Sequence, residues 1–246
     1  MKSLHRLLFL VVAASLPLAY AQTSKPDASA AMEKPDAKGG FRKMHESFLE
    51  RSKSGPIGLL FIGDSITAGW TRAPEVWKEY YDKYQPANFG IGGDQTQHVI
   101  WRIENGELNG IHPKVVVLML GTNNTGANTA DEIAAADKKI VQMIRAKIPE
   151  TKVLLLAIFP RGPRKDKEGK ITDDGVSRMS IIRAANAQLA KLDDGKNVRF
   201  LDIGPKFLDA DGKIPDSIMP DQLHPNVEGY KIWAAAMQPT LEKMMK

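Results

Sequence analysis

The sequence has no cysteine, so it can form no disulfide bond and cannot carry a lipid on an N-terminal cysteine. It also has no repeat of 20–50 residues, which argues against solenoids and propellers. The longest apolar run near the N-terminus, Leu7 to Leu18, is shorter than the roughly 20 residues that cross a bilayer. The sequence therefore predicts no stable membrane insertion.

The sequence also has only a small excess of one sign of charge over the other. The net charge is +5, and without residues 1–21, which contain Lys2 and Arg6, it becomes 32 − 29 = +3. The densest basic stretch, Arg161 to Lys170, includes two acids and is expected to be a solvated loop. A charge this small argues against nucleic acid or an anionic membrane as a partner.

The N-terminal residues 1–21 resemble a signal peptide. The basic residues Lys2, His5 and Arg6 precede the apolar run, and Ala19-Tyr20-Ala21 places small residues where signal peptidase cuts. We expect a signal peptide and an exported protein, periplasmic or secreted; the alternative is a buried N-terminal helix. Residues 22–40 have almost no bulky apolar side chain and predict a flexible linker.

From residue 41 to 246, apolar strands alternate with amphipathic helices. Near-continuous apolar strands separated by helices predict one α/β domain, a three-layer αβα sandwich around a parallel sheet. The first helix is expected to bury Phe41, Met44, Phe48 and Leu49. The expected strands are 57–62, 87–89, 115–120, 153–159 and 198–203, and the expected helices are 41–51, 76–84, 96–103, 131–147, 177–192 and 227–244.

Polar and glycine-rich stretches follow these strands in turn. Ligands of open parallel sheets bind at the carboxyl ends of the strands, so these stretches should converge at one edge. The stretches contain Ser65 after the first strand, Gly93 after the second, Asn123 after the third, and Asp221 and His224 after the last.

A serine nucleophile needs a general base, and five histidines compete for that role. Position eliminates four of them. His5 lies in the signal segment, His45 at the exposed start of the first helix, His98 inside a helix, and His112 at the opposite edge of the sheet. His224 remains as the predicted base for Ser65.

Asp221 lies three residues before His224, a spacing that can bring a carboxylate to the imidazole Nδ1. The alternative is a helix-capping cluster before Pro225. Asp64 adjoins Ser65 on an extended strand and points the other way, so we expect it to stabilise the turn. The predicted catalytic residues are Ser65, Asp221 and His224.

An attacked ester develops negative charge on its carbonyl oxygen, and backbone or amide donors must already point there. The backbone N–H of Ser65, the N–H of Gly93 and the side-chain amide of Asn123 are the candidates. The alternatives are an ordinary tight turn at Gly93 and a helix-capping turn at Asn123.

The sequence argues against two other kinds of site. The turn over residues 63–67 lacks the G-x-G-x-x-G pattern of dinucleotide sites. It also differs from the G-x-S-x-G pattern of α/β-hydrolases, because Thr67 stands at the position of the second glycine. A metal-dependent phosphoesterase could use Asp64, Asp94 and His224, but it lacks the usual histidine-rich ligand set. We therefore expect no metal and no cofactor.

Four ordered blocks resemble the SGNH, or GDSL, hydrolase family. They are Gly63-Asp64-Ser65, Asn88 to Asp94, Gly121-Thr122-Asn123-Asn124 and Asp221 to Pro225. The blocks are most similar to platelet-activating-factor acetylhydrolase catalytic subunits and their bacterial relatives. The resemblance implies a flavodoxin-like fold with a five-stranded parallel sheet, an oxyanion hole of Ser65, Gly93 and Asn123, and hydrolysis of short acyl esters, often acetyl esters.

The expected substrate is a small-molecule or carbohydrate ester, because exported bacterial members of the family commonly deacetylate sugars. Lipid esters are the alternative substrate class, and a carbohydrate-binding protein without turnover is the alternative function.

Overall fold

The computed structural model describes residues 25–246, and the predicted signal peptide lies outside this range. Five parallel strands form the central sheet in the order β2-β1-β3-β4-β7. Counted along the chain, this is the flavodoxin-like order 2-1-3-4-5. The strands are β1 Leu59–Gly63, β2 Pro86–Gly90, β3 Val115–Met119, β4 Lys152–Leu156 and β7 Val198–Leu201.

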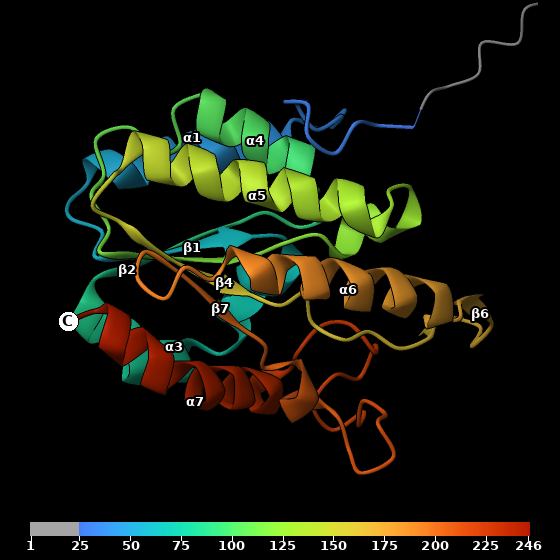
Figure 1. The fold of residues 1–246 in the computed structure, drawn as a ribbon. Coiled ribbons are helices and arrows are strands. Elements are labelled where there is room, and N and C mark those ends of the chain that lie inside the picture. The colour runs from blue at the N-terminus through green and yellow to red at the C-terminus, as the bar shows by residue number, and fades with distance from the viewer. Residues whose placement is uncertain (1–24) are drawn as a thin grey trace, which may run out of the picture.

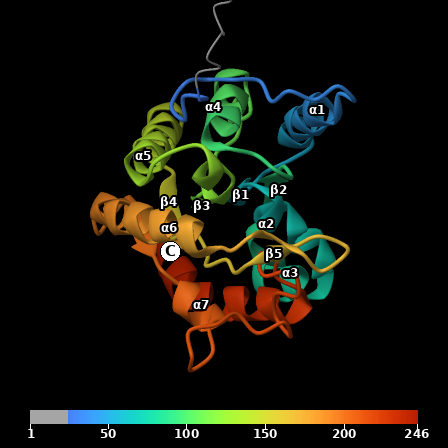
Figure 2. The same cartoon turned by 90° about the vertical axis from the view of Figure 1, so that its right-hand side faces the viewer.

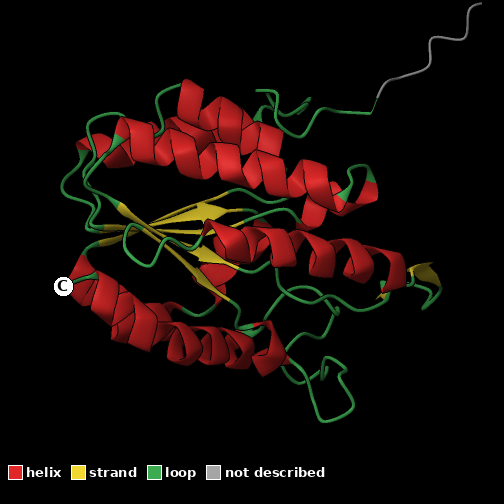
Figure 3. Ribbon diagram, viewed as in Figure 1, coloured by secondary structure: helices red, strands yellow, loops and turns green. Residues whose placement is uncertain are grey.

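Helices cover both faces of the sheet, which confirms the predicted sandwich (Figures 1 and 3). One face carries α1 Gly40–Lys53, α4 Thr96–Glu104, α5 Ala130–Lys147 and α6 Val176–Leu189, and the other carries α3 Pro74–Tyr81 and α7 Val227–Met244. The short elements are α2 Ser65–Ala68, the strands β5 Arg164–Lys165 and β6 Ile171–Asp173, and the 3-10 helices η1 Gly69–Arg72, η2 Asp82–Tyr84, η3 Thr122–Gly126, η4 Ala190–Leu192 and η5 Gly204–Phe207.

Successive side chains of β1 point to opposite faces of the sheet, and each face has its own hydrophobic core. Leu60 and Ile62 pack with the helices of one face, and Leu59 and Phe61 pack with those of the other. All four side chains have no exposed surface. Trp70 is also buried, at 1% exposure. Within residues 25–246, no helix is long and apolar enough to span a membrane.

The first helix corrects two expectations. Met44 is 41% exposed, whereas His45 is buried, and its Nε2 lies 3.2 Å from the carbonyl oxygen of Asn105. The apolar stripe therefore runs through Phe41, His45 and Phe48, with Met44 on the solvent side. Sequence spacing alone could not choose between Met44 and His45, because three or four residues after Phe41 both lie on the same side of a helix as Phe41.

Residues 25–39, part of the predicted linker, make contacts with the domain that their composition did not predict. Ala28 is 1% exposed and its carbonyl oxygen accepts a hydrogen bond from Thr96 Oγ1 at 2.8 Å. The Met32 N–H donates to the carbonyl oxygen of Gln97 at 3.1 Å. Hydrogen bonds from polar groups thus hold this segment against the domain, where an argument from composition would require bulky apolar side chains.

The basic stretch after residue 160 is corrected in part, since residues 165–170 are exposed as expected. It forms the antiparallel β5–β6 hairpin, which projects at the right of Figure 1. Arg161 is buried rather than solvated, and its Nη2 lies 2.8 Å from Asp173 Oδ2. Strands of two and three residues leave too short a pattern for sequence periodicity to detect.

Asp137 on α5 is a buried acid that the fold leaves without a partner. It is 1% exposed, and neither carboxylate oxygen has a hydrogen-bond partner among the described residues. Burial, and then the charge of Asp64, raise the pKa of Asp137 well above its usual value. The folded state therefore holds a proton that the unfolded state releases, and stability should fall as the pH rises above the unfolded pKa.

We expect Asp137→Asn, which cannot ionise, to remove this pH dependence. Measured by urea unfolding, its free energy of unfolding should exceed that of the wild type by at least about 1.4 kcal/mol at pH 8, the equivalent of one pKa unit. The gain should be smaller at pH 5. Asp211→Asn, at an exposed position, serves as the control. A difference between wild type and Asp137→Asn that does not change with pH would contradict the assignment.

Candidate active site

Ser65 begins α2 directly after β1, in a turn that the surrounding groups fix. The fully buried Asp64 caps α2, since its Oδ1 accepts from the Ile66 N–H at 2.9 Å. The Tyr230 hydroxyl on α7 donates to the Ile66 carbonyl oxygen at 2.6 Å. At Gly63, a Cβ would lie 2.1 Å from Thr67 Oγ1, so only glycine lets α2 fold back on the strand. Asp64 thus stabilises the turn, as the sequence predicted.

The structure brings Ser65, His224 and Asp221 into one hydrogen-bonded line. Ser65 Oγ lies 2.9 Å from His224 Nε2, and His224 Nδ1 lies 2.6 Å from Asp221 Oδ2. The other carboxylate oxygen of Asp221 accepts from the backbone N–H of His224 at 2.7 Å. The N-terminus of α7 is instead capped by Asn226, whose side chain accepts from the Gly229 N–H. Asp221 is therefore free of the capping role that was its alternative.

Gln222 sets the geometry between Asp221 and His224. It adopts a left-handed conformation, with φ 61°, which costs free energy for a residue with a side chain. Its amide Nε2 donates to the Ile214 carbonyl oxygen at 3.1 Å and to Asp216 Oδ1 at 2.6 Å, and these bonds hold the strained residue. Figure 2 looks onto this end of the molecule, where α2 and β5 lie.

The electrostatics suit Asp221 for the ionised state. Burial alone would raise the pKa of its carboxyl, but the hydrogen bonds from His224 and the charges of His224 and Arg164 outweigh burial and hold the pKa well below its usual value. Arg164 Nη1, on the hairpin, lies 3.4 Å from Asp221 Oδ2. An ionised carboxylate at Nδ1 keeps the imidazole proton there and leaves Nε2 free to accept a proton from Ser65.

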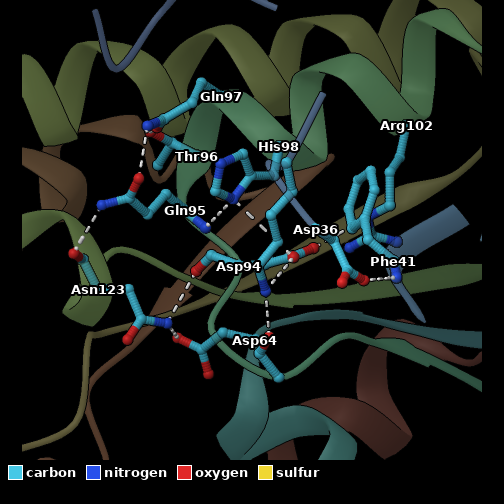
Figure 4. Close-up of polar contacts among 12 residues, drawn as sticks. Asp36, Phe41, Asp64, Asp94, Gln95, Thr96, Gln97, His98, Arg102 and Asn123 are labelled. Atoms are coloured by element: carbon cyan, nitrogen blue, oxygen red, sulfur yellow. Dashed lines mark hydrogen bonds and ion pairs between the residues drawn. The ribbon is translucent and has the colours of Figure 1, made fainter. Parts of the chain in front are cut away.

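The three candidate oxyanion donors also lie at this edge of the sheet. Asn123, in η3, donates from Nδ2 to the backbone carbonyl oxygen of Asp94 at 2.8 Å, with Asp64 Oδ2 at 3.4 Å (Figure 4). Gly93 has a positive φ of 73°, which favours glycine. Among the hydrogen bonds of residues 25–246, none uses the backbone N–H of Ser65 or Gly93. Those two donors are unoccupied, and the Asn123 amide is held in place by Asp94.

Sequence reasoning missed a buried charge cluster behind this turn. Arg102 has no exposed surface, and its Nε lies 3.1 Å from Asp94 Oδ2. Arg102 also forms an ion pair with Glu107 and donates to the Phe89 carbonyl oxygen at 3.0 Å. A signal was available, since Arg102 follows Val99 by three residues and so shares its buried helix face.

Burial shifts the pKa values of two residues at this cluster. Burial raises the pKa of Asp94 to about 6, against the opposing charges of Arg102 and Lys34. Burial lowers the pKa of His98 to about 4, and its Nδ1 accepts from the Gln95 N–H at 3.0 Å. His98 thus caps α4, and its ring is buried away from solvent. Burial likewise raises the pKa of Asp64 to about 7.

The alternative metal ligands do not assemble. Asp64 is committed to the α2 cap and Asp94 to two cations. Over the described part of the chain, no three acids, histidines or cysteines are grouped so that they could hold a metal ion.

The chain is similar in sequence to proteins of a known family. Residues 61–232 match the model of the GDSL-like lipase/acylhydrolase family. The chain is 36% identical over 211 residues to the platelet-activating factor acetylhydrolase IB subunit alpha1 of Bos taurus, covering 84% of each sequence.

Two solved structures are similar in fold. One, described as a putative platelet activating factor from Streptococcus pneumonia, has a TM-score of 0.67 and 22% identity, covering 81% of this chain and 92% of that one. The other is a carbohydrate esterase family 3 protein from Talaromyces cellulolyticus, with a TM-score of 0.55 and 21% identity, covering 77% and 98%.

Proposed function

Because the chain belongs to the GDSL-like lipase/acylhydrolase family of carboxylic ester hydrolases, we propose that Ser65, His224 and Asp221 form its catalytic triad. The observation that carries this proposal is the continuous line from Ser65 Oγ through His224 to Asp221 at the carboxyl edge of the sheet. A serine hydroxyl bonded to an imidazole that a carboxylate orients is the arrangement that activates serine for attack on an acyl carbon.

The reaction is a two-step acyl transfer. His224 takes the Ser65 proton as Oγ attacks the ester carbonyl, and the resulting oxyanion is bound by the N–H groups of Ser65 and Gly93 and the amide of Asn123. His224 then protonates the leaving alcohol, which departs and leaves an acyl-enzyme. Water, deprotonated by His224, releases the acid and restores Ser65.

We propose short acyl groups, acetyl above all, and a polar, carbohydrate-like alcohol. The acetyl preference draws on the acetylhydrolase name of the relatives at 36% identity. The polar alcohol draws on a cavity of about 600 Å³ beside Asp221, where five of the nine lining residues are charged and a sixth is an amide. The charged and amide groups of this wall can bond the hydroxyl groups of a sugar, beside apolar surface from Pro163, Ile214 and Pro220. The cavity is lined by Pro163, Arg164, Lys165, Lys213, Ile214, Asp216, Pro220, Asp221 and Gln222.

We also propose that residues 1–21 direct export, on the strength of their basic, apolar and small-residue order. Sequencing the N-terminus of the protein recovered from the periplasm or medium tests this; a chain that keeps residues 1–21 would contradict it.

A substrate panel tests the substrate class. We expect p-nitrophenyl acetate and butyrate to be hydrolysed at least about tenfold faster than the octanoate, because a short-acyl site excludes extra methylenes. Acetylated sugars should release acetate faster than an acetylated glycerophospholipid, and excess chelator should leave all rates unchanged. Faster release from the phospholipid would favour the lipid alternative, and no release from any ester would favour a binding protein without turnover.

A further inference from the structure

The segment before α1 delivers a cation to the proposed oxyanion turn. Lys34 Nζ donates to the carbonyl oxygen of Gly92 and lies 3.6 Å from Asp94 Oδ1. A Cβ built on Gly93 would lie 3.1 Å from Lys34 Nζ, so the ammonium lies directly on the turn. The Lys34 side chain is 22% exposed. Residue 34 also precedes the stretch 61–232 that matches the family model.

The contact with Gly92 controls a proposed catalytic donor. The Gly92 carbonyl and the Gly93 N–H belong to the same peptide group, which is planar and trans, so they point in opposite directions. An ammonium that holds the carbonyl therefore fixes the direction of the N–H. The turn borders the nucleophile, since a Cβ on Gly92 would lie 4.0 Å from Ser65 Cβ.

The contact with Asp94 controls a second donor. The Asp94 backbone carbonyl oxygen orients the Asn123 amide at 2.8 Å, and its carboxylate is held by Lys34 on one side and by Arg102 on the other. His98 Nδ1 lies 4.0 Å from the same carboxylate. Loss of Lys34 would leave this buried carboxylate with Arg102 alone, and Arg102 is shared with Glu107.

The rest of the segment is built to hold Lys34 there. Glu33 forms an ion pair with Arg42 on α1, and the Asp36 carboxylate accepts from the Phe41 N–H at 2.6 Å. Upstream, Lys25 pairs with Glu132, with Nζ 2.7 Å from Oε1. Contacts on both sides of residue 34 thus anchor it to α1 and α5. Figure 4 shows the hydrogen bond between Phe41 and Asp36.

We propose that Lys34 is a positioning residue of the oxyanion hole, which holds the Gly92–Gly93 peptide and Asp94 so that their donors face the nucleophile. This inference rests on the proposed esterase function. It predicts that catalysis depends on the segment 25–39, which precedes the stretch 61–232 that matches the family model.

The test compares Lys34→Met and Lys34→Arg with wild type, using p-nitrophenyl acetate and an organophosphate that titrates reactive Ser65. Met keeps the length of the side chain and removes its charge, and Arg keeps a cationic donor. Lys38→Met is the matched control, since Lys38 is exposed in the same segment and its side chain makes no hydrogen bond or ion pair among the described residues.

For Lys34→Met we expect kcat per titrated site to fall about tenfold or more, less than the 10²–10³ lost with a whole oxyanion donor, while KM stays within about twofold. Lys34→Arg should recover most of kcat, and Lys38→Met should equal wild type. A role in folding alone would lower the number of titrated sites and leave the rate per site unchanged, so the titration separates the two.

A rate per site for Lys34→Met within about twofold of wild type would overturn the proposal, and so would Lys34→Arg as slow as Lys34→Met. Wild-type protein without ester hydrolysis would instead overturn the proposed function. If Lys34→Met yields no folded protein, the decision falls to Lys34→Gln by the same rate per site.

Discussion

Replacing Ser65 with alanine is expected to lower kcat/KM for p-nitrophenyl acetate by at least about 10⁴-fold. The Oγ that lies 2.9 Å from His224 Nε2 is the only atom in the line that can form the acyl-enzyme. Its loss leaves binding and the other oxyanion donors, which give only residual catalysis. Steady-state rates with burst analysis measure the change.

The control for this variant is Ser177→Ala, an exposed serine on α6 whose hydroxyl makes no hydrogen bond among the described residues. It should match wild type in rate and melting temperature. Because Ser65 is only half-buried and the cap of α2 belongs to Asp64, Ser65→Ala should also melt like wild type. A Ser65→Ala protein that keeps more than about a tenth of the wild-type rate would contradict the nucleophile assignment.

Asp221→Asn is expected to lower kcat by about 10²- to 10⁴-fold, with little change in KM. The asparagine amide can present an N–H to His224 Nδ1, which drives the imidazole proton to Nε2, where it can no longer accept the proton of Ser65. The lower limit reflects a side chain that is 42% exposed, so water can replace part of the lost interaction.

Asp211→Asn makes the same change of charge at an exposed position and should leave kcat unchanged. The Arg164 contact with Asp221 adds a second check, since Arg164→Gln removes a neighbouring cation without touching His224. It should reduce kcat far less than Asp221→Asn. If Asp221→Asn retains kcat within about threefold of wild type, Asp221 only holds its turn and the base works without it.

The layered fold was predictable because each buried strand carries an uninterrupted apolar run. Residues 115–119 are all buried, and an uninterrupted apolar run of this kind predicts a central strand of a parallel sheet, covered on both faces. The helix 227–244 was predicted with the bounds that the structure has. The convergence of Ser65, Asn123 and His224 followed from the same parallel arrangement, since every one of them follows a strand.

What sequence could not supply were contacts made by single polar groups. Residues 25–39 hold their place through backbone carbonyls and ion pairs, which leave no periodic pattern in the sequence. His45 is buried because Asn105 and Glu107, some sixty residues away, meet its imidazole. Arg102 is buried because Asp94 and Glu107 compensate its charge. Each of these depends on tertiary partners that hydrophobicity does not encode.

The most direct test of the central claim is to label the protein with a fluorophosphonate and to identify the modified residue by mass spectrometry. The triad account predicts one adduct, on the peptide that contains Ser65, formed at the same rate as activity is lost. The adduct should be absent from Ser65→Ala and at least about 10³-fold slower to form in His224→Ala, because the hydroxyl then has no base. Activity that survives complete labelling of Ser65, or equal labelling rates in wild type and His224→Ala, would contradict it.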